Sequence, residues 1–230
     1  MQRHLILTSI LIAGLVNAEP STFHPDSRLA KGTFKNHVYQ NDFLGLTYFI
    51  PEAWTVELQL PVKTFMAPGG DAMVRDGVLR RESVRADQSH TYNLLQAVSP
   101  RADFITGYLP NISIIVEHLP KGGRITTADA YLQNAIRMFK QMTSAHYEIL
   151  DPRKKLVVGG RDFVRADYRA TLARPDSPTG QLSILQSQYV TVVNGYALQL
   201  ILSAGTEKRM DELRGSLEKL QFSHNESNDK

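Results

Sequence analysis

The 230-residue sequence contains no cysteine. This absence excludes disulfides, a catalytic thiol, thiolate metal ligands and a lipid attached through a thiol. The sequence also lacks a marked charge surplus, because 26 Lys and Arg residues oppose 23 Asp and Glu residues, for a formal net charge of +3. The basic residues are scattered along the chain and form no stripe, so no nucleic-acid partner is predicted.

The motifs of familiar catalytic and metal sites are missing as well. The chain has 7 His residues, none of which lies three or four positions from another, so a helical zinc pair is excluded. Ser113 and Ser183 lack the Gly-x-Ser-x-Gly pattern of a nucleophile elbow. The glycine turn Lys121–Arg124 lacks the spacing of a phosphate-binding loop. The sequence therefore predicts no catalytic, cofactor-binding or metal-ligating residues, and no cofactor.

Three features allow both a functional and a structural interpretation. The adjacent residues Glu117 and His118 could contribute to a metal site, but an ordinary exposed histidine is the commoner case. Trp54, the single tryptophan, could stack on a ligand, although a large ring just after a strand more often caps a core. Asn111 and Asn225 begin glycosylation sequons, which matter only in a eukaryotic secretory pathway.

A short apolar run lies near the start of the chain. Leu5–Val16 follows the basic residue Arg3, and Val16-Asn17-Ala18 resembles a cleavage site with small residues. Residues 1–18 are therefore predicted to be a signal peptide, and the mature chain is expected to be secreted or periplasmic, soluble and without an integral membrane span. The alternative is an anchor that is never cleaved, although the run is shorter than the ~20 residues of a spanning helix.

The rest of the chain is predicted to form one domain with flexible ends. Residues 19–37 contain two prolines and no apolar period, which is typical of a flexible tether, with a stalk or a partner-binding segment as alternatives. Residues 38–222 carry the periodic apolar pattern of a single domain, whose core is large enough to fold without disulfides. Residues 223–230 are polar and are predicted to be a disordered tail.

The elements of this domain follow from periodicity and turn signals. Strands are predicted around residues 38–50, 91–98, 112–116, 154–158, 161–172, 181–193 and 196–202, with hairpin turns at Gly159-Gly160 and Asn194-Gly195. One helix is predicted to start at a capping box formed by Thr126 and Asp129. A last helix, capped by Thr206, is predicted to carry a stripe of apolar residues: Met210, Leu213, Leu217 and Leu220. This order predicts the α+β class, with helices packed on one antiparallel sheet.

Residues 61–90 interrupt this pattern. The segment contains prolines and glycines, and Asp71–Asp87 could form a helix whose basic and acidic residues balance each other. A long loop on a rigid scaffold often carries function. The structural interpretation, a solvated covering helix with internal ion pairs, is favoured.

Several of these residues resemble the PsbP-like family. Tyr39, Asn41, Gly45, Pro51 and Trp54 are similar to its N-terminal signature, and the Gly160–Phe163 hairpin, the Asn194–Leu198 turn and the Leu213 and Leu217 helix match its layout. Ala53 departs from the glycine that the family usually has before the tryptophan. The resemblance covers roughly Val38 to Phe222 and implies an α/β/α sandwich around a central twisted antiparallel sheet.

The resemblance also guides the functional hypothesis. Plant members assist the oxygen-evolving centre of photosystem II, a protein of related fold binds a nuclear-transport GTPase, and many bacterial exported members have no assigned role. The resemblance therefore implies an exported, non-catalytic binding or assembly protein whose partner is another protein or an envelope component, and which uses its sheet edge or the 61–90 loop. The alternative is an extracytoplasmic hydrolase or ligand-processing enzyme with a site formed from distant residues. No oligomeric state is predicted.

Overall fold

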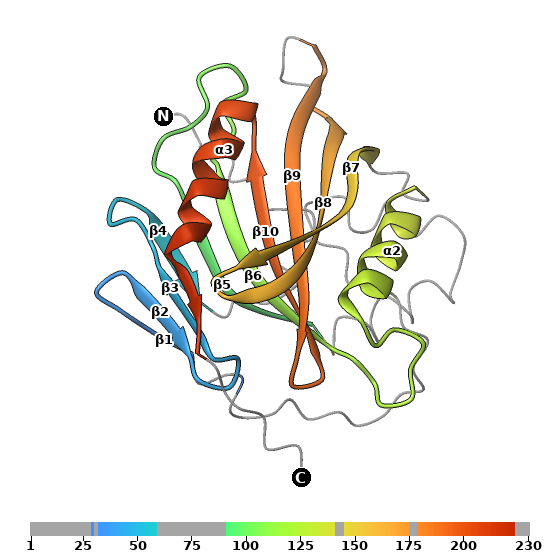
Figure 1. Ribbon diagram of the computed structural model, residues 1–230. Helices are drawn as coiled ribbons and strands as arrows, with labels where there is room; N and C mark the ends of the chain where they lie inside the picture. The colour runs from blue at the N-terminus through green and yellow to red at the C-terminus, as the bar shows by residue number, and fades with distance from the viewer. Residues whose placement is uncertain (1–28, 30–31, 59–90, 141–144, 175–178, 224–230) are drawn as a thin grey trace.

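The computed structural model describes residue 29 and residues 32–58, 91–140, 145–174 and 179–223 (Figure 1). Within these residues, the chain forms two antiparallel sheets and two α-helices. The predicted signal peptide, the 61–90 segment with its predicted helix, and the residues after Ser223 lie outside the described residues.

The larger sheet contains most of the sheet residues. It consists of seven strands in the order β4-β5-β6-β10-β9-β8-β7, and every neighbouring pair is antiparallel. The strands are β4 (Thr55–Leu58), β5 (Thr91–Val98), β6 (Asn111–His118), β7 (Ala145–Val158), β8 (Arg161–Ala173), β9 (Gln181–Val193) and β10 (Tyr196–Ala204). The predicted hairpins are confirmed, because Gly159, Gly160, Asn194 and Gly195 all have the positive φ that tight turns require. The antiparallel α+β class is confirmed as well.

The prediction of one sheet is wrong, because the described residues also form a smaller second sheet. It has the order β1-β2-β3-β11 and consists of β1 (Thr33–Lys35), β2 (Val38–Asn41), β3 (Leu46–Phe49) and β11 (Leu220–Phe222). Pro51 lies between β3 and β4 and has no N–H group for a ladder, so the chain leaves the smaller sheet there and enters the larger one at β4. The buried side chains of Tyr39 and Tyr48 contribute to the core beneath the smaller sheet.

The ordered domain begins before the predicted boundary at Val38. The sequence predicts a tether through His37, whereas Thr33–Lys35 forms β1 and pairs with β2. Leu29 is 1% exposed and belongs to the main core, which is the cluster of buried apolar residues that also contains Tyr39 and Tyr48. A three-residue strand is too short to show a period, and for this reason composition alone suggested a tether.

The two helices pack against opposite faces of the larger sheet. Successive residues of a strand point to opposite faces. In β10, Leu198 and Leu200 pack in the main core with Met210 of α3 (Glu207–Ser216), whereas Ala197 packs in a second core with Tyr131 of α2 (Ala128–Phe139). In Figure 1, α3 lies over β10 and α2 lies on the side of β7 and β8.

The helix ends differ from the prediction in three places. The side chain that caps α2 is Thr127, whose Oγ1 accepts a hydrogen bond from the backbone N–H of Ala130, so the predicted box of Thr126 and Asp129 is wrong by one residue. Thr206 occupies the N-cap position of α3, but its side chain makes no cap hydrogen bond. The predicted stripe of the last helix ends early, because Leu217–Lys219 is a 3-10 turn and Leu220 starts β11.

Candidate functional site

The adjacent residues Glu117 and His118 do not form a metal pair. They follow each other on β6, so their side chains lie on opposite faces of the sheet. Glu117 is buried and accepts a hydrogen bond of 2.5 Å from the Tyr131 hydroxyl, whereas the His118 ring packs edge-on against Tyr196 at 5.3 Å. Among the described residues, no group of three or more His, Asp and Glu side chains could hold a metal ion.

The other sequence candidates serve the scaffold. Trp54 is partly buried and packs against the main core, as its structural interpretation predicts. Asn111 is 1% exposed and donates to Tyr108 Oη and Leu109 O, so the folded chain has no room for a glycan there. Ser113 is buried in β6, and Ser183 is exposed on β9. Asn225 and the 61–90 loop lie outside the described residues.

A chain of buried polar side chains crosses the face of the larger sheet that carries α2. From Glu117 and Tyr131 it continues through Gln199 Nε2, which donates to Tyr131 Oη at 2.7 Å. Gln188 Nε2 then donates to Gln199 Oε1 at 2.8 Å, and the Tyr168 hydroxyl donates to Gln188 Oε1 at 3.2 Å. Each side chain of the network forms a hydrogen bond with the next one. These bonds offset the cost of burying amide and phenol groups in a core. This network joins α2 to β6, β8, β9 and β10.

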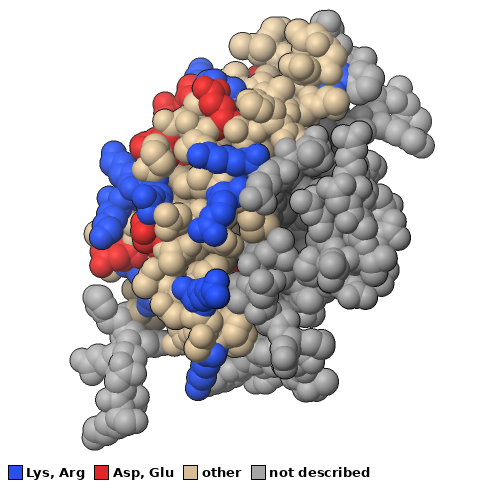
Figure 2. Space-filling view, turned by 90° about the vertical axis from the view of Figure 1, so that its right-hand side faces the viewer, with Lys and Arg blue, Asp and Glu red and all other residues tan. Residues whose placement is uncertain are grey.

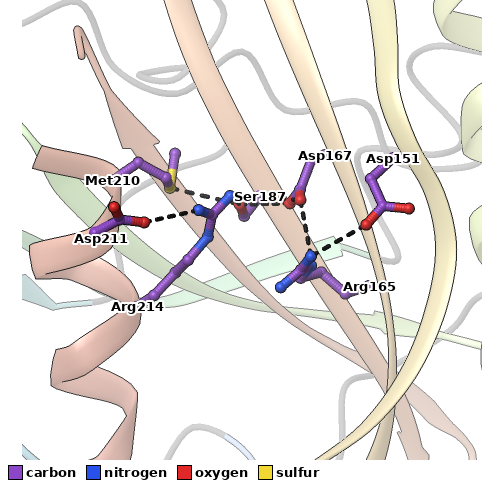
Figure 3. Close-up of polar contacts among 7 residues, drawn as sticks. All are labelled: Asp151, Arg165, Asp167, Ser187, Met210, Asp211 and Arg214. Atoms are coloured by element: carbon purple, nitrogen blue, oxygen red, sulfur yellow. Dashed lines mark hydrogen bonds and ion pairs between the residues drawn. The ribbon is translucent and has the colours of Figure 1, made fainter. Parts of the chain in front are cut away.

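A second polar cluster fastens α3 to the other face of the sheet (Figure 3). Asp167 of β8 is only 10% exposed in its side chain and lies between two arginines. Its Oδ2 is 3.0 Å from Arg165 Nη2 and 3.4 Å from Arg214 Nη2, and its Oδ1 accepts a 2.6 Å hydrogen bond from Ser187 Oγ. Arg214, in the last turn of α3, also donates to Ser187 Oγ at 3.2 Å. These four residues are termed the α3 clamp.

The charges of the α3 clamp shift the titration of one arginine. Burial alone would lower the pKa of Arg165, but the Asp167 carboxylate, with support from Tyr189 and Asp151, outweighs burial and raises it. The Ser187 hydroxyl donates to the Asp167 carboxylate, whose oxygens also contact the guanidinium groups of Arg165 and Arg214. These contacts join α3 to the sheet.

The best candidate for a functional site is the connection between β5 and β6. Residues 99–110, termed the Phe104 loop, are organised by one carboxylate. Asp103 Oδ1 accepts the N–H groups of Ile105 at 2.9 Å and Thr106 at 3.0 Å, together with the Thr106 hydroxyl at 3.3 Å. Asp103 Oδ2 accepts the hydroxyl of Thr206 at 2.6 Å. This bond explains why Thr206 does not cap its own helix.

Further contacts hold the Phe104 loop against the body of the protein. Arg174, at the end of β8, donates to the carbonyl oxygen of Thr106 at 3.3 Å. The Thr106 side chain also lies so close to Gly205 that a Cβ atom there would be 2.0 Å from Thr106 Oγ1. The buried Tyr108 anchors the far side of the loop among Leu182 and Ile184. The loop is therefore fixed to β8, to β9 and to the start of α3.

This rigid loop exposes two large apolar side chains. Phe104 is 102% exposed and Ile105 is 82% exposed, which makes them the most exposed large apolar residues that the structure describes. Burying two such side chains contributes roughly 3–6 kcal/mol. A rigid loop also loses little conformational freedom when it docks. The arrangement can therefore bind an apolar surface.

The Phe104 loop is not among the candidate sites that the sequence motifs predict. A signal was available, because Pro100 and Pro110 bracket a segment in which Asp103 precedes Phe104-Ile105 and Gly107 follows. Asp at the first position of a turn often accepts the backbone N–H groups that follow it. Two apolar residues inside such a turn cannot belong to a sheet face and point outward. The remote partner Thr206 could not have been found in this way.

The edge strand β7 is a weaker candidate than the Phe104 loop. Its pairing with β8 is irregular between Ile149 and Lys154, and Arg153 has a φ of 50°. Pro152 lacks an N–H group, and Lys154 and Lys155 are exposed. Bulges, prolines and lysines are the features that protect an edge from pairing with another strand. The structure therefore gives no support to docking at this edge.

Charges on the side of α2 and β7 are mixed. Figure 2 shows Lys and Arg side chains beside Asp and Glu side chains along the left margin of this side. Two exposed pairs are Arg169 with Glu148 at 2.7 Å and Arg153 with Asp129 at 3.1 Å. Such pairs favour solubility and contribute little to stability. Within the described chain, no helix has the length and apolar character to cross a membrane.

Comparison with solved structures finds similar proteins at low sequence identity. The solution structure of cyanobacterial PsbP (CyanoP) from Synechocystis sp. PCC 6803 is 15% identical, with a TM-score of 0.43, and the match covers 81% of this chain and 91% of that chain. LpqN, involved in cell envelope biogenesis of Mycobacterium tuberculosis, is also 15% identical, with a TM-score of 0.43 and coverage of 77% and 83%. The Saccharomyces cerevisiae Ran-binding protein Mog1p is 11% identical, with a TM-score of 0.33 and coverage of 76% and 79%. No family model matches the sequence, and no match was found among curated proteins.

Proposed function

We propose that this chain is an exported, non-catalytic binding or assembly protein that docks onto another protein or envelope component through the Phe104 loop. The observation that carries the proposal is the high exposure of Phe104 and Ile105, at 102% and 82%, on a loop fixed by the Asp103 carboxylate. The leader pattern in residues 1–18 supports export. The scaffold is an α/β/α sandwich with a central twisted antiparallel sheet, which holds the loop at one end.

The polar groups of the interior support binding more than catalysis. The polar groups of the Glu117 network hydrogen-bond to one another, and the Asp167 carboxylate of the α3 clamp contacts Ser187, Arg165 and Arg214. Groups committed to internal hydrogen bonds stabilise the scaffold and are not available to transfer protons. The alternative of a hydrolase therefore draws no support from Ser187, whose hydroxyl faces a carboxylate between two arginines.

Crosslinking in the native cell envelope tests the proposal. The double variant F104S/I105S removes both apolar side chains, and the loss of such anchors typically weakens binding about thirtyfold or more. Val157→Ser is the matched control, because Val157 is also a large apolar residue that is 65% exposed, but lies on β7. We expect the double variant to lose a specific crosslinked component that the wild type and Val157→Ser both retain. Retention of every component by the double variant would refute the proposal.

A further inference from the structure

We propose that the component bound by the Phe104 loop is a lipid bilayer with anionic headgroups, into whose interfacial region Phe104 and Ile105 insert. This inference rests on the proposed function, because it names the partner of the same loop. It concerns a peripheral contact by the tip of one loop, in which the rest of the domain stays in water. Three features of the loop carry it: its internally bonded backbone, its apolar tip and the arginines beside it.

Four backbone N–H groups of the tip donate to acceptors within the loop. The N–H groups of Ile105 and Thr106 donate to Asp103 Oδ1, the N–H of Gly107 donates to Asp103 O at 2.8 Å, and the N–H of Tyr108 donates to Thr106 Oγ1 at 3.2 Å. Four successive donors are therefore satisfied without water. An N–H group left without an acceptor is costly in apolar surroundings. Donors that already have acceptors within the loop lower the cost of placing the tip in the interfacial region.

The exposed side chains of the tip are all apolar. From residue 102 to residue 107, the exposed positions are Ala102, Phe104, Ile105 and Gly107. The single charge in this segment, Asp103, is 5% exposed and accepts the hydrogen bonds described above. Thr106 is half-buried, and its hydroxyl donates to Asp103 Oδ1. The tip thus has no exposed polar side chain to exchange with a protein, whereas protein interfaces typically surround an apolar centre with hydrogen-bonding groups.

Arginines lie beside the apolar tip. Arg101 is exposed and comes directly before the exposed part of the loop. Arg174 contacts the loop through its hydrogen bond to Thr106 O. Cations at this level meet the phosphate groups of a bilayer when the tip enters the interface, and arginine binds phosphate with several donors at once. An apolar tip flanked by arginines therefore complements an anionic lipid surface.

Fluorescence of a tryptophan placed in the loop tests the inference. The full chain has one tryptophan, so Trp54→Phe removes the background signal, and Phe104→Trp then reports on the loop alone. The probe is a vesicle of equal parts phosphatidylglycerol and phosphatidylcholine, with bromine on the phosphatidylcholine acyl chains. We expect a blue shift and strong quenching at position 104. The matched control is Val157→Trp in the same Trp54→Phe chain, which should show neither, because Val157 lies on β7. Thermal unfolding verifies that both variants are folded.

Vesicle cosedimentation adds a second measurement. We expect F104S/I105S to bind at least tenfold more weakly than the wild type, and Arg101→Gln to lose about fivefold on the anionic vesicles but nothing on pure phosphatidylcholine. All variants share residues 1–18, so any membrane affinity of the leader is constant across the series.

The outcomes separate this inference from the proposed function. Quenching at position 104 no stronger than at position 157 would overturn the bilayer as partner. If F104S/I105S nevertheless loses a crosslinked protein in the envelope, the loop docks onto that protein, and the proposed function stands without the inference. If the double variant changes neither measurement, both fall.

Discussion

Asp103 shows how one side chain can determine the conformation of a loop. Burial alone would raise the pKa of this carboxyl, but hydrogen bonds from Thr206, Thr106 and Ile105 outweigh burial and hold its pKa below the ordinary value. The carboxylate is therefore stabilised by the same donors that fix the loop. Because these donors come from residues near Asp103 and from the start of α3, the loop and the helix share one anchor.

Replacing Asp103 tests this anchor. We expect Asp103→Ala to release the loop and to cost roughly 1–3 kcal/mol, because four donors lose a common buried acceptor. Asp103→Asn is the matched control, since its amide oxygen can still accept the N–H groups of Ile105 and Thr106. Its amide nitrogen can donate to the Thr206 hydroxyl, which then acts as the acceptor. Amide hydrogen exchange at Ile105 should accelerate strongly in Asp103→Ala and only slightly in Asp103→Asn. Equal protection in all three chains would contradict the role of the carboxylate.

The pH dependence of the same exchange follows from the lowered pKa. A carboxyl whose pKa is lower in the folded chain stabilises that chain above the unfolded pKa of about 3.9. This contribution is lost as the pH falls through the folded pKa. Protection of Ile105 that depends on Asp103 should therefore persist at neutral pH and be lost as the pH falls through the lowered pKa of Asp103.

At the scale of elements, α3 is held at both of its ends. Thr206 at its start donates to Asp103, and Arg214 in its last turn contacts Asp167 and Ser187. Between them, Met210 packs in the main core, and its Sδ lies 3.4 Å from Ser187 Oγ. One end of α3 is therefore bonded to the Phe104 loop and the other end to the larger sheet, so the helix holds the loop in place.

The α3 clamp should contribute measurably to stability. We expect Asp167→Ala to cost roughly 2–4 kcal/mol, because it leaves Arg165 and Arg214 without their shared, largely buried carboxylate. Asp151→Ala is the control, since Asp151 also contacts Arg165, at 3.3 Å, but its side chain is 47% exposed. An exposed partner of this kind typically contributes less than about 1 kcal/mol. Urea unfolding of the two variants measures the difference, and equal losses would show that the clamp does not depend on the buried carboxylate.

The predictability of each element follows from its physical signal. The strand at 112–116 and the hairpin at Asn194-Gly195 are predictable because a β-branched run and a positive-φ turn are local signals. The strand at 91–98 is likewise predictable from its mixture of apolar and polar residues before Pro100. The spacing of Leu220 predicts that it belongs to the last helix, yet it pairs with Tyr48 in a strand. That pairing joins residues far apart in the sequence, and no local pattern contains it. The same limit applies to the site, where Asp103 and Phe104 carry a turn signal but Thr206 does not.

At the scale of the whole molecule, the first and last of the described strands, β1 and β11, form the two edges of the smaller sheet. β11 pairs with one side of β3, and β2 pairs with the other side. β1 in turn pairs with β2. Ser216, at the end of α3, lies 3.1 Å from the hydroxyl of Tyr48 in β3. The smaller sheet therefore ties the N-terminal part of the domain to its C-terminal helix, and it covers part of the main core that a single sheet would leave open.

Leu29 tests whether this closure includes residues before Val38. Its side chain is 1% exposed within the main core, and its carbonyl oxygen accepts a hydrogen bond of 3.0 Å from Asn41 Nδ2 in β2. We expect Leu29→Ala to lower the free energy of unfolding by about 2–5 kcal/mol, the usual cost of emptying a buried leucine site. Leu58→Ala is the control, because Leu58 lies on the edge strand β4 and is 38% exposed.

Urea unfolding distinguishes a core residue from a tether at this position. A core role predicts that Leu29→Ala lowers the midpoint while the slope stays constant, since the surface exposed on unfolding hardly changes. If Leu29 belonged to a tether, as composition alone suggests for residues 19–37, the midpoint would not change. A solvated side chain does not contribute to the free energy of unfolding. If Leu29→Ala shifted the midpoint no more than Leu58→Ala does, the stable domain would begin at Val38. β1 would then be a dispensable edge strand of the smaller sheet.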